Sequence, residues 1–268
     1  MLLALPTYGQ NRETDYLSHV LEKMNAVESV TYHCVKKAWE PGDKEPGYNV
    51  PREIYEHVNP QDTAVGYSFL CASDKEFRQP LWVYDGTVFA YIEKEEKEVR
   101  IDDFTQKSPL PFRVIMPQAF GCMKSILEYA LNTQDSIVLS LKDEGKDYLM
   151  ELSIHTPYQV EFFGKACYMP QNPYIYDPTS IYKIWISKEN DMPYRYRREM
   201  QHSISEDICS DFVYNPSGKG KIVAEDYYPA DYVRRIKGEK SQKATVDMTG
   251  KKAVSYTHLR AHETVLDL

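Results

Sequence analysis

Side chains alternate along residues Ile181 to Met200 in a way that few folds other than an antiparallel sheet can satisfy. The alternating set is Tyr182, Ile184 and Ile186 on one face, and Ile181, Lys183, Trp185 and Ser187 on the other. A polar run, Lys188 to Asp191, interrupts the pattern, which then resumes with tyrosines and arginines in alternation. Such a period of two predicts a hairpin with one face on a core and the other in water.

Further segments repeat this pattern, so we expect a mainly β (α+β) fold: a curved antiparallel sheet or half-open barrel. The expected strands, about ten, are residues 29–39, 50–58, 63–73, 81–92, 99–104, 136–142, 148–155, 158–169, 205–214 and 221–227. Asp85-Gly86 predicts a tight turn inside the segment 81–92, because glycine accepts a positive φ. Residues 14–25 and 117–131 instead place apolar side chains at helical spacing, which predicts two amphipathic helices.

Composition limits the classes of function. The chain has 268 residues and a formal net charge of −8, which argues against a nucleic-acid partner, since phosphates require concentrated positive charge. No segment approaches the roughly 18 apolar residues of a membrane span. The 22 tyrosines favour half-buried pleated surfaces, where the ring packs and the hydroxyl stays in water.

The cysteines are scattered along the chain, at Cys34, Cys71, Cys122, Cys167 and Cys209. They form no C-x-x-C pair and no cluster with histidine at zinc-ligand spacing, so we expect no metal and no cofactor. Thiols in this arrangement are typical of core residues. Spacing leaves one long-range disulfide open.

Pairs of acidic or basic residues do not form a catalytic motif. Asp102 and Asp103 are adjacent on a strand and point to opposite faces, so they cannot act on one substrate. The same holds for Glu225 and Asp226. Glu199 and His202 have metal spacing only on a helix, and the stretch reads as strand and turn. The histidines, which are His19, His33, His57, His155 and His202, have no nucleophile motif beside them. We therefore expect no catalytic residues in this chain.

The two ends are expected to lie outside the domain, which we place at residues 10–233. Residues 1–9 are apolar with small residues before Gln10, which indicates the remnant of a signal peptide; a short apolar strand is the alternative. Residues 234–253 read as a linker that ends at the start of a further domain. Residues 254–268 include VSYTHLRAHET, which resembles a translated sequencing adapter, so we treat them, and the spacing of His258 and His262, as an assembly artefact.

Several segments together resemble the upstream region of exported thioredoxin-like thiol:disulfide oxidoreductases of the TlpA/ResA type. They are WVYDGTVFAYI (82–92), PLPF (109–112), VEFFGKACYMPQNPY (160–174), IYKIWISKENDMPYRYRREM (181–200) and AEDYYPADY (224–232). In that family the upstream domain resembles the lipoprotein carrier LolA. TGKKA (249–253) resembles the entry to the thioredoxin-like domain, but Val254 stands where the family has proline. The C-x-x-C motif of that domain is not in this chain, so no catalytic residue is carried over.

The resemblance implies a non-catalytic accessory domain of an exported oxidoreductase, in the periplasm or cell envelope of a Gram-negative bacterium. An alternative is an envelope carrier or sensor that binds a lipid or other apolar ligand in the concave face of the sheet, lined by Trp82, Trp185 and Phe162. A structural β domain, with these aromatics as ordinary core, is also open. Arg195, Arg197 and Arg198 are predicted to face solvent or an envelope protein partner.

Overall fold

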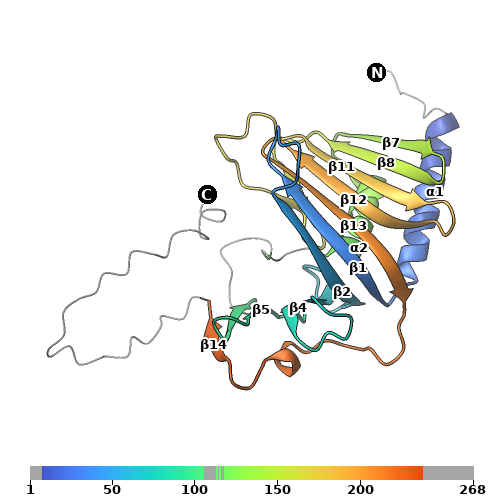
Figure 1. Ribbon diagram of the computed structural model, residues 1–268. Helices are drawn as coiled ribbons and strands as arrows, with labels where there is room; N and C mark the ends of the chain where they lie inside the picture. Colours follow the sequence, from blue (N-terminus) through green and yellow to red (C-terminus); the bar gives the residue numbers. More distant parts are fainter. Residues whose placement is uncertain (1–7, 106–112, 114, 116–117, 238–268) are drawn as a thin grey trace.

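A computed structural model describes residues 8–105, 113, 115 and 118–237. Their fold is mainly β, with one large, open, curved sheet and two helices, as the alternation predicts (Figure 1). The elements are α1 (Tyr8–Asn25), β1 (Ser29–Trp39), β2 (Tyr48–Val58), β3 (Tyr67–Ala72), β4 (Pro80–Tyr84), β5 (Val88–Glu93), β6 (Glu98–Asp103), α2 (Ala119–Asn132), β7 (Ile137–Glu144), β8 (Asp147–Ile154), β9 (Val160–Phe162), β10 (Ala166–Tyr168), β11 (Ser180–Ser187), β12 (Met192–Met200), β13 (Ser203–Tyr214), the 3-10 helix η1 (Ala224–Tyr227) and β14 (Val233–Ile236).

Twelve of these strands form the large sheet, in the order β14-β6-β5-β4-β3-β2-β1-β13-β12-β11-β8-β7. Neighbours pair antiparallel except β14, which runs parallel to β6. β1 joins the two halves of this sheet, β14 to β2 and β13 to β7, because one of its edges pairs with β2 and the other with β13. β13 comes from near the end of the domain. A separate two-stranded sheet, β9-β10, lies beside the main one.

The predicted hairpin is present as β11 and β12. Lys183 lies opposite Arg197 and Ile184 opposite Tyr196, with one irregularity after Trp185. Burial alternates strictly along β11, so Tyr182, Ile184 and Ile186 are buried while the residues between them are partly exposed. The hairpin is not the centre of the sheet, because β13, β1 and β2 continue it on one side and β8 and β7 close it on the other.

Both helices cover one face of the sheet, which we call the inner face (Figure 1). Leu17, Val20 and Met24 of α1 are fully buried, in agreement with their i, i+3, i+7 spacing. The stripe Phe120, Met123, Ile126 and Leu127 of α2 is also fully buried, in the same core as the apolar side of β11. The predicted amphipathic helices are therefore confirmed, although α1 begins at Tyr8, inside the expected signal segment.

A second core lies under strands β3 to β6. Here the expected strand at 221–227 is wrong: Ile222 and Ala224 are buried against this part of the sheet, but the chain turns into η1. The backbone N–H of Ala224 donates to the side chain of Asp85, in the turn between β4 and β5, instead of to a neighbouring strand. β14 was not expected, because its exposed side chains do not alternate between apolar and polar. It spans residue 234, where the linker was predicted to start.

Glu56 of β2 is a buried carboxylate that holds α2 against the sheet. Its Oε1 accepts from the Tyr32 hydroxyl at 2.6 Å and from the backbone N–H of Phe120 at 3.0 Å, and its Oε2 accepts from Gly121 N–H at 3.0 Å. The first turn of α2 has no acidic residue, and Gln118 at the N-cap makes no side-chain capping bond. Glu56 therefore satisfies orphan N–H groups of the helix from a different element.

The β9-β10 hairpin docks on the loop before β3 through Gly164, which has a φ of +91°. A Cβ built on Gly164 would lie 2.2 Å from the carbonyl oxygen of Val65, so only glycine fits this approach. Ser125 of α2 donates to the Gly164 carbonyl at 2.5 Å, which fixes the hairpin from the other side. The bend of the chain at this glycine is thus also a packing contact.

We expect Gly164→Ala to lower the free energy of unfolding by about 3 kcal/mol or more, since backbone strain and a clash with Val65 add. Gly145→Ala is the matched control: Gly145 has a φ of +77°, but nothing lies within 4 Å of its Cβ position, so strain alone should cost about 1 kcal/mol. Urea unfolding followed by circular dichroism measures both. Equal losses would show that the contact with Val65 does not exist.

Candidate functional site

The inner face of the sheet is filled rather than open. Beside α2, residues of β1, β2 and β4 enclose a cavity of about 20 Å³, room for about one water molecule. Trp82 forms part of its wall, with its ring stacked on Tyr91 at 6.0 Å and the Arg52 guanidinium 5.3 Å from the ring centre. A space of this size cannot hold an acyl chain.

The three aromatics that were expected to line a concave site do not come together. Trp82 belongs to the main core and is 7% exposed. Phe162 lies on the separate hairpin, 2% exposed, with its ring edge-on to Tyr182 at 5.0 Å. Trp185 alternates to the opposite, outer face, where the Arg195 guanidinium lies 4.0 Å from its ring centre. The predicted lining is wrong, because α2 and Phe162 fill the space on the inner face where a ligand was expected.

The arginines of β12 divide between the two faces. Arg195 and Arg197 lie on the outer face and form ion pairs with Glu206 at 2.6 Å and with Glu199 at 2.7 Å. Arg198 points to the inner side and pairs with Glu161 of β9, so the prediction that it faces solvent is wrong. Its Nε is buried without a hydrogen-bond partner. Charges on the outer face are thus paired along the sheet.

The inner face carries a buried polar group of its own between β1 and β13. Lys36 Nζ lies 3.4 Å from Asp207 Oδ2, and Cys34 Sγ lies 3.7 Å from the other oxygen of the same carboxylate. Burial lowers the pKa of Lys36, but the carboxylate of Asp207 and the thiols of Cys34 and Cys122 together outweigh it, so the net shift is upward. Lys36 and Asp207 thus form an ion pair inside the core, next to the thiol of Cys34.

Other candidate pairs from the sequence are also engaged in local contacts. Asp102 lies 3.7 Å from Lys237, while Asp103 accepts from Thr105 N–H at 2.8 Å. Glu225 pairs with Arg234 at 3.9 Å. In the described part of the chain, no group of three or more His, Cys, Asp or Glu could hold a metal ion. No helix there is long and apolar enough to cross a membrane.

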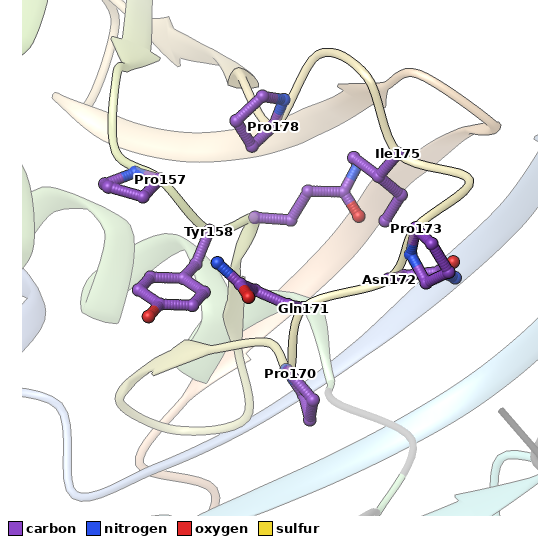
Figure 2. Close-up of a pocket in the computed structure, with 9 residues that line it drawn as sticks. Pro157, Tyr158, Pro170, Gln171, Asn172, Pro173, Ile175 and Pro178 are labelled. Carbon is purple, nitrogen blue, oxygen red and sulfur yellow. The ribbon is translucent and has the colours of Figure 1, made fainter.

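A larger hollow lies at one end of the sheet, between the loop after β8 and the loop before β11 (Figure 2). It has a volume of about 390 Å³. We call it the proline-tyrosine hollow; it is lined by Pro157, Tyr158, Gln159, Pro170, Gln171, Asn172, Pro173, Ile175 and Pro178. Pro157 and Tyr158 lie on one side of it, and Pro173 and Ile175 on the other (Figure 2). No charged residue lines it.

Hydrogen bonds hold the longer loop in place. The side chain of Gln201, in the turn after β12, accepts the N–H groups of Tyr176 and Asp177, both at 2.7 Å, and donates to the Tyr174 carbonyl at 3.2 Å. The His202 ring lies 3.0 Å from the same carbonyl. Four prolines add rigidity, because each fixes its own φ. The hollow is therefore largely preformed.

One exposed tyrosine, Tyr158, lines the hollow, and Tyr174 and Tyr176 flank the lining residue Ile175 in the sequence. Tyr174 is 62% and Tyr176 85% exposed, and Tyr158 and Tyr168 are also exposed. Large rings left in water on a fixed loop are a feature of binding surfaces, since they offer contact area at low entropic cost. Residues 170–180 show no strand or helix period, and the one signal in the sequence for such a surface is the proximity of three prolines to two tyrosines.

Comparison with known proteins gives likeness in the fold only. No protein-family model matches the chain, and no curated protein matches it. Among solved structures, the chain is similar to lipoprotein LppX of Mycobacterium tuberculosis (9% identity, 79% of this chain and 99% of that one, TM-score 0.40). It is also similar to LprF from Mycobacterium bovis (9%, 78% and 98%, 0.39) and a LolA superfamily protein from Nitrosomonas europaea (10%, 81% and 99%, 0.28).

The buried carboxyl of Glu56 gives the protein a distinctive pH dependence. Burial raises its pKa from 4.5 to about 7, although its three hydrogen bonds act in the opposite direction. Below pH 4.5 the carboxyl is protonated in both the folded and unfolded states, and the stabilisation from the raised pKa is fully present. It is lost as pH rises through 7, because the folded state must then ionise a buried group.

We expect the free energy of unfolding of the wild type to fall by about 3 kcal/mol relative to that of Glu56→Gln between pH 4.5 and pH 7.5. Urea unfolding at several pH values measures the difference. Glu53→Gln on the same strand is the control, since Glu53 is partly exposed and pairs with His33. A constant difference between wild type and Glu56→Gln across this range would contradict the shift.

Proposed function

We propose that this domain is a non-catalytic binding domain that takes an apolar or amphipathic ligand in the proline-tyrosine hollow. The observation that carries the proposal is the hollow itself, with a volume of about 390 Å³ and a lining without charge. Pockets for small ligands usually have volumes of about 300–1,000 Å³ and mostly apolar walls with a few polar groups. The proposed ligand therefore lies at the end of the sheet and not on its inner face.

The lining indicates which chemistry the hollow would accept. Tyr158 and Ile175 offer apolar contact, and proline rings lose little entropy when they pack on a ligand. The side-chain amides of Gln159, Gln171 and Asn172 can donate and accept hydrogen bonds. An ionised headgroup would find no counter-charge among these residues. We therefore favour a neutral amphiphile, such as a lipid with an uncharged headgroup.

An envelope location and an accessory role beside a thioredoxin-like domain are further parts of the proposal. The apolar residues 1–9, with small residues before Gln10, support export. The quoted motifs support the oxidoreductase setting, in which this domain would precede the catalytic one. The intact gene tests that setting: a C-x-x-C motif soon after residue 253 is expected, and a gene without one would end the oxidoreductase proposal.

Binding can be measured with the neutral apolar dye N-phenyl-1-naphthylamine, whose fluorescence rises in an apolar site. We expect the wild-type chain to bind the dye and Ile175→Asp to bind it at least about tenfold more weakly, a loss of about 1.4 kcal/mol, because a carboxylate in the hollow must be desolvated. Native mass spectrometry of the purified wild type should also show a co-purifying lipid.

Val138→Asp is the matched control. Val138 is 61% exposed on β7, where it lines none of the hollow, so the same change of charge should leave dye affinity unaltered. Equal weakening in both variants would mean that the dye responds to net charge. Unchanged binding in Ile175→Asp, with the fold intact by circular dichroism, would move the ligand away from the hollow and contradict the proposal.

A further inference from the structure

Two cysteines that are far apart in the sequence lie directly opposite each other in the sheet. Cys34 of β1 pairs in register with Cys209 of β13, between the pairs His33 with Ser210 and Val35 with Ile208. Directly opposed residues of an antiparallel ladder point to the same face, with Cα atoms about 4.5–5.5 Å apart. A disulfide requires about 4.4–6.8 Å between Cα atoms. The backbone therefore already satisfies this requirement.

The two side chains also meet. Cys34 is 6% and Cys209 4% exposed, and both belong to the core beneath α2. The pKa of the Cys209 thiol lies well above its ordinary value, first because of burial and then because of a hydrogen bond with Cys34. In this structure both are free thiols.

We propose that Cys34 and Cys209 are an oxidation site that forms a cross-strand disulfide when the protein folds in an oxidising compartment. The bond would tie β1 to β13 at the join between the two halves of the sheet. It would close a loop between positions 34 and 209, and a crosslink that closes a long loop restricts the unfolded chain strongly. The inference stands on the register of the strands and does not depend on the proposed ligand.

The other three cysteines are poorly placed to compete. Cys71 lies on β3, and β2 separates that strand from β1. Two strand spacings amount to about 9.5 Å, beyond the reach of a disulfide. Cys122 Sγ of α2 donates to the Phe162 carbonyl and Cys167 Sγ to the Lys165 carbonyl, both at 3.4 Å. Cys34 and Cys209 are thus the one cysteine pair that the strand register of the described residues sets directly opposite each other.

The chemistry needs a disulfide-bearing oxidant, for which oxidised glutathione serves. One thiol loses its proton and attacks the glutathione disulfide, releasing one reduced glutathione and leaving a mixed disulfide. The second thiol, after losing its proton, attacks that mixed disulfide and releases a second glutathione. Two protons and two electrons leave the pair. Because burial disfavours the thiolates, we expect the bond to form during folding, before the core closes over the pair.

The test is to unfold the full chain with a reductant and refold it in a buffer of reduced and oxidised glutathione. We expect an intact mass about 2 Da below that of the reduced chain, and a peptide map that joins Cys34 to Cys209. The urea midpoint should be higher for the oxidised protein and return to the lower value with a reductant. Cys34→Ala and Cys209→Ala should lose both effects, while Cys167→Ala keeps them.

Five free thiols after refolding would overturn the proposal, and so would a disulfide between any other pair. A chain that carries one bound glutathione and no internal bond would also count against it, since the second thiol would then be out of reach. The mass and peptide map of the wild type decide the question even if an alanine variant fails to fold.

Discussion

The carboxylate of Glu56 is the contact on which the arrangement of this domain depends. It takes hydrogen bonds from Tyr32 on β1 and from two N–H groups at the start of α2, so one buried side chain joins two strands and a helix. Gly121 permits this approach, because a Cβ there would lie 2.9 Å from Glu56 Oε2. With α2 held in this position, its apolar stripe fills the inner face of the sheet.

The position of α2 decides where the proposed ligand could bind. A helix seated on the inner face leaves a cavity of about 20 Å³ there, whereas the loops at the end of the sheet leave about 390 Å³. On the outer face, Arg195 and Arg197 stack on Trp185 and on Trp39 and pair with acidic neighbours, so this face is a network of paired charges. The proline-tyrosine hollow combines sufficient volume with an uncharged lining.

Much of the fold follows from local pattern. The alternation of residues 181–200 and the helical spacing of Leu17, Val20 and Met24 report burial directly, because a strand has a period of two and a helix a period of 3.6. β14 escaped prediction because an edge strand with exposed side chains carries no such pattern. The 3-10 helix η1 was taken for a strand because short apolar runs do not distinguish the two.

The candidate site was harder to predict, because each part of it depends on distant residues. The acceptor for Phe120 N–H lies 64 residues earlier in the chain, and the hollow needs the loop around Pro157 to face the loop around Pro173. Trp185 and Trp82 look alike in sequence, but the first is on the outer face and the second in the core. Cys34 and Cys209 lie opposite each other because β1 and β13 are neighbours in the sheet, and no local sequence pattern reveals that strand order.

Photolabelling distinguishes an apolar ligand in the hollow from one on the inner face. An alkyl diazirine probe, activated on the intact chain and mapped by peptide mass spectrometry, labels the residues that line its site. For a ligand in the hollow, we expect labels at Tyr158 and in residues 170–178. Labels concentrated around Trp82 and Ala119, with none on these loops, would contradict it.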